Sequence, residues 1–172
     1  YNNEEATTEA IDKEGWFHTG DIGHVDEDGF LFITDRKKNI LVTSAGKNVA
    51  PAPIENALVS SAFIEQSVVI GDKRNFISAL IVPSAEALEK ELTARDIDTS
   101  DIDLMSDHIE VKKIIQEEVD KAMLEFSNYE KVKEFSVLPR LFTIDEGELT
   151  PTLKVVRKVV MNNFSEYVEK NY

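Results

Sequence analysis

The sequence predicts an α+β fold in which a β-hairpin precedes a short mixed sheet flanked by helices. Two pairs of apolar segments, each joined by a turn rich in Gly, Asp or Asn, indicate hairpins. A long amphipathic segment over residues 104–127 and another near the end of the chain indicate helices that cover the sheet. Strands paired locally, with helices set apart from them, are typical of the α+β class.

The first forty residues are expected to form a short helix and a hairpin. Residues 5–11 favour the helix, and residues 22–25 and 30–34 alternate as two hairpin strands would. The turn between the strands ends in Gly29, which supplies the positive φ of a tight turn. A short strand at residues 39–43 follows.

The remaining elements mix helices and strands. Pro51 and Pro53 prepare a helix, because proline is tolerated in a first helical turn. Glu55 lies in that first turn, where a carboxylate complements the helix dipole. We then expect, in order, strands at 67–70 and 77–82, a helix capped by Ser84 and ending near 92, a loop at 93–103, the long helix at 104–127, a strand at 134–138, an exposed loop at 140–150 and a final helix from about 153 to 168.

Composition limits the class of protein. The 172 residues, 42% of them hydrophobic, suffice for the core of one domain with an appendage. A net charge of −14 argues against nucleic-acid binding and against polybasic docking on an anionic membrane. The absence of cysteine excludes disulfides and thiolate metal sites, and no apolar run is long enough to span a membrane. We expect a cytoplasmic protein without metal ligands of its own, and peripheral contact with a membrane stays open.

Charge is unevenly distributed along the chain. Residues 86–130 hold fourteen acids against five bases. Residues 36–47 hold four bases and residues 150–165 hold three, and neither segment contains an acid. Two basic clusters beside Gly or Pro turns in an acidic chain suit a polyphosphate ligand. Ordinary solvated faces are the alternative, and charge alone favours it.

The run from Gly15 to Asp21 is the first candidate site. Its two glycines let the backbone approach a ligand closely, and Asp21 offers two acceptor oxygens that suit the hydroxyls of a ribose. A structural loop around a buried Trp16 explains the run equally well. His18 is interpreted as a loop or packing residue, because no partner stands beside it at triad or metal-ligand spacing.

Two basic segments come next. Arg36 carries a planar fork that suits phosphate or ribose oxygens, and the short charged join up to Lys38 is a good place for a hinge. A basic exit from a hairpin is the alternative. In the loop at residues 44–48, Gly46 permits close backbone approach and Lys47 can meet a phosphate, although the P-loop pattern is absent.

Lys154 ends a run that begins at Thr150. A lysine held on a turn after Pro151 is a mobile point charge that can bridge oxygens in a phosphoryl or adenylyl transition state. A surface lysine at the start of a helix is the alternative, and it is the more common case for one lysine in isolation.

Taken in order, these segments resemble the C-terminal part of the adenylate-forming superfamily, and within it the long-chain fatty acyl-CoA synthetases. The match is strong over residues 15–60 and 145–160 and loose elsewhere. The run from Thr150 to Lys154 has the form typical of the long-chain branch, where most other branches have Ser-Gly-Lys. Residues 39–43 lack a lysine that many relatives carry, so a secondary phosphate contact is not expected.

The resemblance implies an enzyme that joins a fatty acid to coenzyme A in two half-reactions, with ATP as the source of AMP and with Mg²⁺. Asp21 would bind the ribose hydroxyls of AMP, and Arg36 would hold ribose or phosphate oxygens. Lys38 would be the pivot of a domain rotation between the half-reactions. Lys154 would contact the carboxylate and the α-phosphate during adenylation. The loop at residues 44–47 would then replace it and line the pantetheine tunnel.

The resemblance also implies that this chain is the back end of a larger enzyme. Residues 1–35 would be the trailing edge of its large N-terminal AMP-binding domain, residues 36–38 the hinge, and residues 39–172 the mobile C-terminal domain. Residues 84–130 are interpreted as a helical insertion, to which no function is assigned. Since most of the large domain is missing, we expect this chain alone to be inactive.

Two other functions stay open. Another adenylate-forming ligase, for an aryl or a short-chain acid, would share these motifs, and the acyl pocket that distinguishes them lies outside this chain. A non-catalytic binding or regulatory module of the same fold is the second, and the retained Asp21 and Lys154 argue against it. The sequence does not give the acyl chain length or the oligomeric state.

Overall fold

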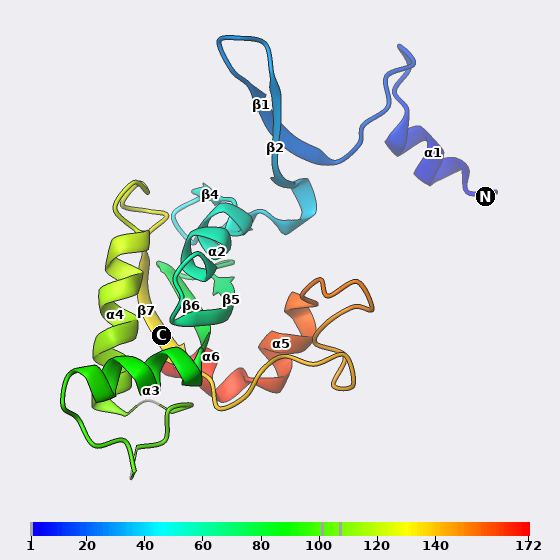
Figure 1. Cartoon of the computed structure of the whole chain (residues 1–172). Helices are drawn as coiled ribbons and strands as arrows, with labels where there is room; N and C mark the ends of the chain where they lie inside the picture. The colour runs from blue at the N-terminus through cyan, green and yellow to red at the C-terminus, as the bar shows by residue number, and fades with distance from the viewer. Residues whose placement is uncertain (1, 101, 107) are drawn as a thin grey trace. The chain divides into compact units, whose positions relative to one another are not determined.

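A computed structural model describes residues 2–100, 102–106 and 108–172 (Figure 1). The chain falls into two compact units, the first up to Ile40 and the second from Leu41 to Tyr172. Helices combined with small sheets, in which every neighbouring pair of strands except β6 and β7 is antiparallel, confirm the predicted α+β class.

The described residues of the first unit form one α-helix, one hairpin and a short 3-10 helix. The helix begins where the side chain of Asn3 accepts a hydrogen bond of 2.9 Å from the Ala6 N–H, as an N-cap does. The hairpin turn ends at Gly29, whose φ of 86° confirms the predicted role of that glycine. In order, the elements are α1 (Glu4–Ala10), β1 (Asp21–Val25), β2 (Leu31–Arg36) and the 3-10 helix η1 (Lys37–Asn39).

The second unit is built around a three-stranded sheet in the order β5-β6-β7. Strand β5 pairs antiparallel with β6, and β6 pairs parallel with β7. A parallel neighbour needs a long crossover, which α3 and α4 supply. In order, the elements are β3 (Leu41–Val42), β4 (Asn48–Val49), α2 (Pro51–Val59), β5 (Ile64–Ile70), β6 (Ile77–Pro83), α3 (Ala85–Ala94), α4 (Ile109–Ala122), β7 (Val132–Val137), α5 (Arg157–Asn163) and α6 (Ser165–Lys170).

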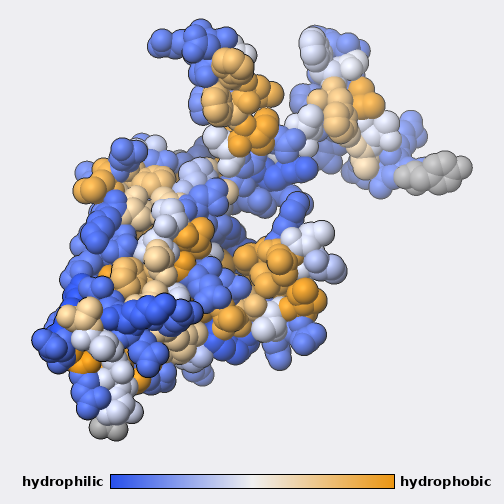
Figure 2. Space-filling view, in the orientation of Figure 1, coloured by the Kyte–Doolittle hydropathy of each residue, from blue (hydrophilic) through white to orange (hydrophobic). Residues whose placement is uncertain are grey.

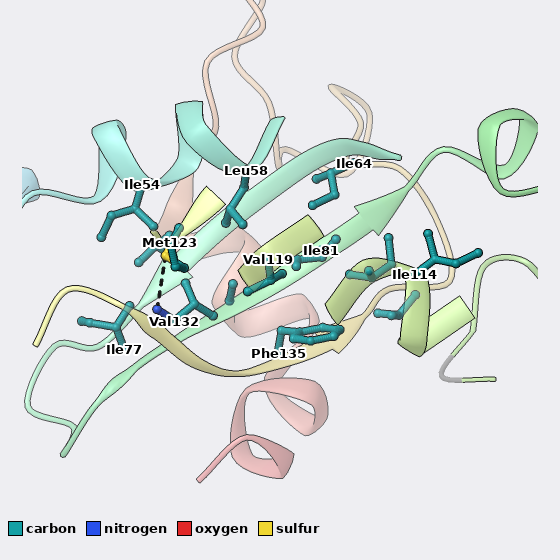
Figure 3. Close-up of a cluster of buried hydrophobic side chains, with 14 of the residues drawn as sticks. Ile54, Leu58, Ile64, Ile77, Ile81, Ile114, Val119, Met123, Val132 and Phe135 are labelled. Atoms are coloured by element: carbon teal, nitrogen blue, oxygen red, sulfur yellow. Dashed lines mark hydrogen bonds between the residues drawn. The ribbon is translucent and has the colours of Figure 1, made fainter. Parts of the chain in front are cut away.

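The sheet separates two hydrophobic clusters. Side chains of one strand point alternately to opposite faces, so Ala79 and Ile81 of β6 join one cluster while Leu80 and Val82 join the other. Helices α2, α3 and α4 cover the first face, and α5 and α6 cover the second. Figure 3 shows the first cluster, in which side chains of α2 and α4 converge on the sheet. Both faces of the sheet are therefore buried, as the near-continuous apolar sequence of β6 requires.

The long helix expected at 104–127 is shorter in the structure. Helix α4 begins after His108, whose ring nitrogen accepts the Glu110 N–H at 3.3 Å, and it ends at Ala122. The chain then turns because Met123 is buried and its sulfur accepts the Val132 N–H at 3.5 Å (Figure 3). Residue 107 of the predicted helix and residue 101 of the loop before it lie outside the described residues.

Four other predictions need correction. The strand expected at 39–43 is only β3, because η1 occupies its first residue. Glu55 lies beyond the first turn of α2 and pairs with Arg157. The loop at 140–150 is not wholly exposed, since Phe142 and Glu148 are buried. The helix expected at about 153–168 is two helices, because Phe164 leaves the helical conformation where its ring packs into the second cluster.

Candidate functional site

Lys154 lies on a small hairpin-like loop rather than on a helix. An isolated bridge between Leu149 and Val155 closes the loop, and the Thr150 N–H donates to the Lys154 carbonyl at 2.8 Å. The Lys154 N–H in turn donates to Thr150 Oγ1 at 3.0 Å. Leu153 adopts a φ of 60°, which turns the chain before the lysine. These contacts fix the backbone and leave the Lys154 side chain exposed.

Glu148 anchors this loop from inside the protein. Its carboxylate accepts two hydrogen bonds of 2.7 Å from the Arg140 guanidinium, and further ones from Asn163 Nδ2 and the Thr143 N–H. The Arg140 guanidinium, with help from Asn163 and Thr143, lowers the pKa of the Glu148 carboxyl from 4.5 to about 2, although burial opposes the shift. A buried carboxylate with this many donors is a rigid support for the exposed loop that follows.

A second ion pair connects the end of the Lys154 loop to helix α2. Arg157 Nη1 lies 2.8 Å from Glu55 Oε1 and also donates to the carbonyl of Val69. Glu55 accepts the Val69 N–H at 2.7 Å. The contacts join α5, α2 and β5 at one point, so the base of the Lys154 loop and the helix that follows the Lys47 loop belong to one rigid body.

The loop that carries Gly46 and Lys47 is closed on itself. The Thr43 N–H donates to the Lys47 carbonyl at 3.0 Å, and the Lys47 N–H donates to Thr43 Oγ1 at 3.1 Å. Gly46 has a φ of 74°, and a Cβ added there would meet no atom within 4 Å. The backbone at Gly46 is therefore open to approach by a ligand, which agrees with the expectation that this glycine permits close backbone approach.

The turn between β5 and β6 holds this loop in place. The Ser44 N–H donates to the Arg74 carbonyl at 2.9 Å, and Ser44 Oγ donates to Asn75 Oδ1 at 2.8 Å. The Arg74 guanidinium lies 4.5 Å from the centre of the Tyr172 ring and pairs with Glu169. The loop is thus tied through the turn to helix α6 at the end of the chain.

The first unit pairs two of the predicted site residues with each other. Asp21 and Arg36 stand opposite on β1 and β2, and Arg36 Nε lies 2.7 Å from Asp21 Oδ1. Lys38 is exposed on η1, next to Arg36. A surface pocket of about 460 Å³ is lined by Glu9, Gly20, Arg36, Lys37 and Lys38. The pocket lining combines the cations Arg36, Lys37 and Lys38, which suit phosphate oxygens, with the carboxylate of Glu9. Asp21 lies beside this lining only through its ion pair with Arg36.

The remaining residues of the Gly15–Asp21 run have local roles. His18 Nε2 lies 3.3 Å from Asp12 Oδ2, and the Trp16 N–H donates to Asp12 Oδ1 at 2.9 Å. That backbone hydrogen bond is the main reason why the pKa of Asp12 is lowered. The Trp16 side chain is 70% exposed, so the alternative of a loop around a buried tryptophan is wrong for this unit.

The structure brings the predicted residues together in three separate groups. Asp21 pairs with Arg36, Gly46 and Lys47 share one loop, and Lys154 stands alone on its own loop. Within the described part of the chain, no carboxylate pairs with the Lys154 ammonium. The sequence did not predict the two ion pairs that hold the Lys154 loop, which join Glu148 to Arg140 and Arg157 to Glu55. The only signal for Glu148 was its place directly before the Leu-Thr-Pro run, since nothing in the pattern distinguishes a buried acid from an exposed one.

Side chains that commonly bind metals do not cluster in the part of the chain that the structure describes. Across residues 2–100, 102–106 and 108–172, no group of three His, Cys, Asp or Glu side chains could hold a metal ion. The same residues form no helix that is long and apolar enough to cross a membrane. The donors that are present suit a nucleotide: paired charged groups on the hairpin and exposed lysines on two loops.

This combination of fold and loops defines the C-terminal domain of adenylate-forming enzymes. The family model for the AMP-binding enzyme C-terminal domain matches residues 38–172, and the chain belongs to that family. Among curated proteins, the chain is similar to the long-chain-fatty-acid–CoA ligase FadD15 of Mycobacterium tuberculosis, with 48% identity over all of this chain and 29% of that protein. It is 35% identical to the long-chain-fatty-acid–CoA ligase ACSBG2 of Gallus gallus, over 99% of this chain and 25% of that protein.

Solved structures agree on the fold. The A-PCP didomain of carboxylic acid reductase from Segniliparus rugosus in complex with AMP is 29% identical, with a TM-score of 0.78, over 99% of this chain and 22% of that one. A fatty acyl CoA synthetase of Mycobacterium tuberculosis is 25% identical, with a TM-score of 0.52, over 96% of this chain and 27% of that one. The resemblance read from the motifs is thereby confirmed, and the chain spans 29% or less of the relatives named here.

Proposed function

We propose that this chain is the C-terminal part of a long-chain fatty acid–CoA ligase, an acid–thiol ligase that forms acyl-CoA, AMP and pyrophosphate from a fatty acid, ATP and coenzyme A. The identity of 48% to a ligase of this name, over the full length of the chain, favours long-chain acids. The single observation that carries the mechanism is the pair of braced, lysine-bearing loops on one rigid unit.

In the first half-reaction, a carboxylate oxygen of the fatty acid forms a bond to the α-phosphorus of ATP. The bond from that phosphorus to the bridging oxygen breaks, and pyrophosphate leaves with the electron pair. Negative charge grows on the phosphate oxygens, and the Lys154 ammonium stabilises it. Exposure on a fixed backbone suits this role, because the lysine can reach a substrate bound outside the unit. Asp21 and Arg36 hold the ribose and phosphate oxygens of the nucleotide.

In the second half-reaction, the sulfur of coenzyme A forms a bond to the acyl carbon as the thiol loses its proton. The bond from that carbon to the phosphate oxygen breaks, and AMP leaves. The loop at residues 44–47 lines the path of the thiol, with the open backbone of Gly46 beside it and Lys47 as a cation for the charged end of the cofactor. Mg²⁺, when bound, would neutralise the charge of the pyrophosphate.

The two half-reactions need different loops at the same place, so the domain that bears them has to turn. We assign the pivot to Lys38 within residues 36–38, residues 1–35 to the edge of the large AMP-binding domain, and residues 39–172 to the moving domain. The division of the chain after Ile40 and the start of the family match at residue 38 support this assignment. This chain alone would be inactive, because it lacks the acyl pocket.

The solved structures favour a second candidate that shares the first half-reaction. The likeness to the adenylation domain of a carboxylic acid reductase has a higher TM-score than the likeness to a fatty acyl CoA synthetase. In that case the acyl group would pass from the adenylate to a carrier-protein thiol instead of coenzyme A. The Lys154 loop would act in the same way, and only the thiol acceptor would differ.

The test is ATP–pyrophosphate exchange by the full-length protein that carries this chain, with Mg²⁺ and with short-chain, aryl and long-chain acids. The proposal predicts exchange that requires a long-chain acid, followed by thioester formation when coenzyme A is added. Exchange with an aryl or short-chain acid alone would reassign the substrate. Adenylation without transfer to coenzyme A favours the second candidate, and no exchange with any acid, from folded protein, leaves a binding module.

A further inference from the structure

The acidic stretch at residues 84–130, which the sequence leaves without a function, contributes a side chain to one of the two lysine loops. The Lys47 ammonium lies 5.6 Å from the centre of the Tyr129 ring. Tyr129 follows helix α4 and is far from Lys47 in the sequence. The fold brings them together because α4 packs beside α2, the helix that directly follows the Lys47 loop.

Tyr129 is held by a turn with its own internal supports. The Ser127 N–H donates to Glu130 Oε2 at 3.2 Å, and the Lys131 N–H donates to the Ser127 carbonyl at 3.2 Å. Just before it, Met123 is buried in the first hydrophobic cluster and Phe126 packs against that cluster. The ring therefore projects from a fixed backbone, with 44% of its surface exposed.

An aromatic face attracts a cation that lies within about 6 Å of its centre. A free lysine side chain samples many rotamers, and ordering it has an entropic cost. Contact with Tyr129 narrows those rotamers before any substrate arrives. The ammonium remains available, because within the described residues no carboxylate pairs with Lys47. A carboxylate would hold the lysine more tightly but would also repel an anionic ligand, which a neutral ring does not.

We propose that Tyr129 is a positioning residue for the thioester-forming half-reaction, in which its ring holds the Lys47 ammonium ready for the anionic part of coenzyme A. This inference rests on the proposed function and extends it to the acidic stretch. In this account, helix α4 and the turn after it hold Tyr129 in position, and Tyr129 acts through Lys47. Tyr129 has no part in adenylation, which uses the Lys154 loop.

The experiment uses the full-length protein and measures the two half-reactions separately. ATP–pyrophosphate exchange reports adenylation, and transfer of a supplied acyl-adenylate to coenzyme A reports thioester formation. We expect Tyr129→Leu to raise the KM for coenzyme A about two- to fivefold, as loss of an exposed cation–π contact would, with exchange unchanged. Tyr129→Phe keeps the aromatic face and should keep the wild-type KM. Leu124→Ala, at an exposed residue of the same turn region, is the matched control and should change neither half-reaction.

A double-mutant cycle tests whether Tyr129 acts through Lys47. In a Lys47→Ala background, Tyr129→Leu should cause no further rise in the KM for coenzyme A. A further rise there, equal slowing of both half-reactions, or a Tyr129→Leu enzyme identical to wild type would each overturn the inference. Wild-type protein that performs neither half-reaction would instead overturn the proposed function on which the inference rests. Thermal unfolding of each variant excludes loss of the fold as the cause.

Discussion

Both units, residues 2–40 and residues 41–172, contain large apolar side chains, but the first unit exposes most of them to solvent and the second buries most of them in a core. In the first unit, Trp16, Phe17 and Leu31 are largely exposed, and Asp35 is the one buried residue that the structure describes there. In the second unit, two clusters bury the sheet on both faces. Figure 2 shows apolar surface over the β1–β2 hairpin. Turn chemistry and strand pairing are thus enough to shape a hairpin but not to give it a core.

The difference also separates the proposed roles. The unit with the core carries the two lysine loops and needs rigidity, because its loops must present charge at a defined place. The unit without a core carries Asp21 and Arg36, and its exposed apolar side chains suit a surface that another domain covers.

The largest expected contrast is in hydrogen exchange of the 172-residue chain. Amides of β6 should open only with global unfolding, at about 5 kcal/mol or more, because both neighbouring strands and both clusters protect them. Amides of β2 should open with a free energy close to zero, since an isolated hairpin is only marginally stable. Exchange measured by mass spectrometry or NMR should differ by about a thousandfold or more. Equal protection of the two strands would contradict the comparison.

Matched truncations test the same contrast through stability. Leu80→Ala removes a fully buried side chain from β6 and should lower the free energy of unfolding of the second unit by about 2–5 kcal/mol. Phe32→Ala removes an aromatic side chain that is 48% exposed in the other unit, so the midpoint of that unfolding should not change. Urea denaturation followed by circular dichroism gives both values. A loss from Phe32→Ala as large as that from Leu80→Ala would show that the hairpin shares the core.

Glu148 should make the second unit sensitive to acid. Its pKa lies at about 2 when folded and near 4.5 when unfolded, so its stabilising effect is complete above the unfolded pKa and is lost as pH falls toward 2. The difference corresponds to about 3 kcal/mol. Glu148→Gln should therefore destabilise the unit at pH 7 and flatten its stability between pH 5 and about 2.

The control for this titration is Asp145→Asn, three residues away, where the carboxylate is exposed. Urea midpoints measured across the acid range should follow the wild type for this variant. If Glu148→Gln and the wild type lose stability in parallel as pH falls, the ion pair with Arg140 is not the source of the acid sensitivity.

The smallest expected effect is at Leu153, where the well-packed unit is locally strained. Leucine at a φ of 60° is unfavourable, and its side chain is 69% exposed, so little packing compensates. Leu153→Gly should raise the free energy of unfolding by about 0.5–1 kcal/mol. Thermal unfolding detects a change of this size as a shift of a few degrees. A decrease would mean that the exposed leucine contributes packing that outweighs the strain.

Local patterns in the sequence predicted the local parts of the fold. The hairpin turn at Gly29, the β5–β6 hairpin and the helix after Pro51 follow from turn residues and periodicity, and all are confirmed. Two boundaries were wrong because tertiary packing decides them. Met123 ends α4 by packing into a cluster, and Phe164 interrupts the last helix for the same reason.

The candidate site could be predicted only as far as the exposed groups. Asp21, Arg36, Lys47 and Lys154 follow from motifs, and their roles remain predictions. The supports could not be found in the same way, because the contacts of Glu148 with Arg140 and Asn163 join residues with no common pattern. The contact of Lys47 with Tyr129 depends on the path of a long crossover, which no local pattern specifies.

The central claim is that the two lysine loops serve different half-reactions, and Lys154→Ala in the full-length protein tests it most directly. ATP–pyrophosphate exchange should fall by about 10²–10³-fold, while transfer of a supplied acyl-adenylate to coenzyme A should remain close to wild type. Lys158→Ala, at an exposed lysine four residues further on in α5, is the matched control and should alter neither rate. Equal loss of both half-reactions, or exchange that survives in Lys154→Ala, would contradict the division of labour between the loops.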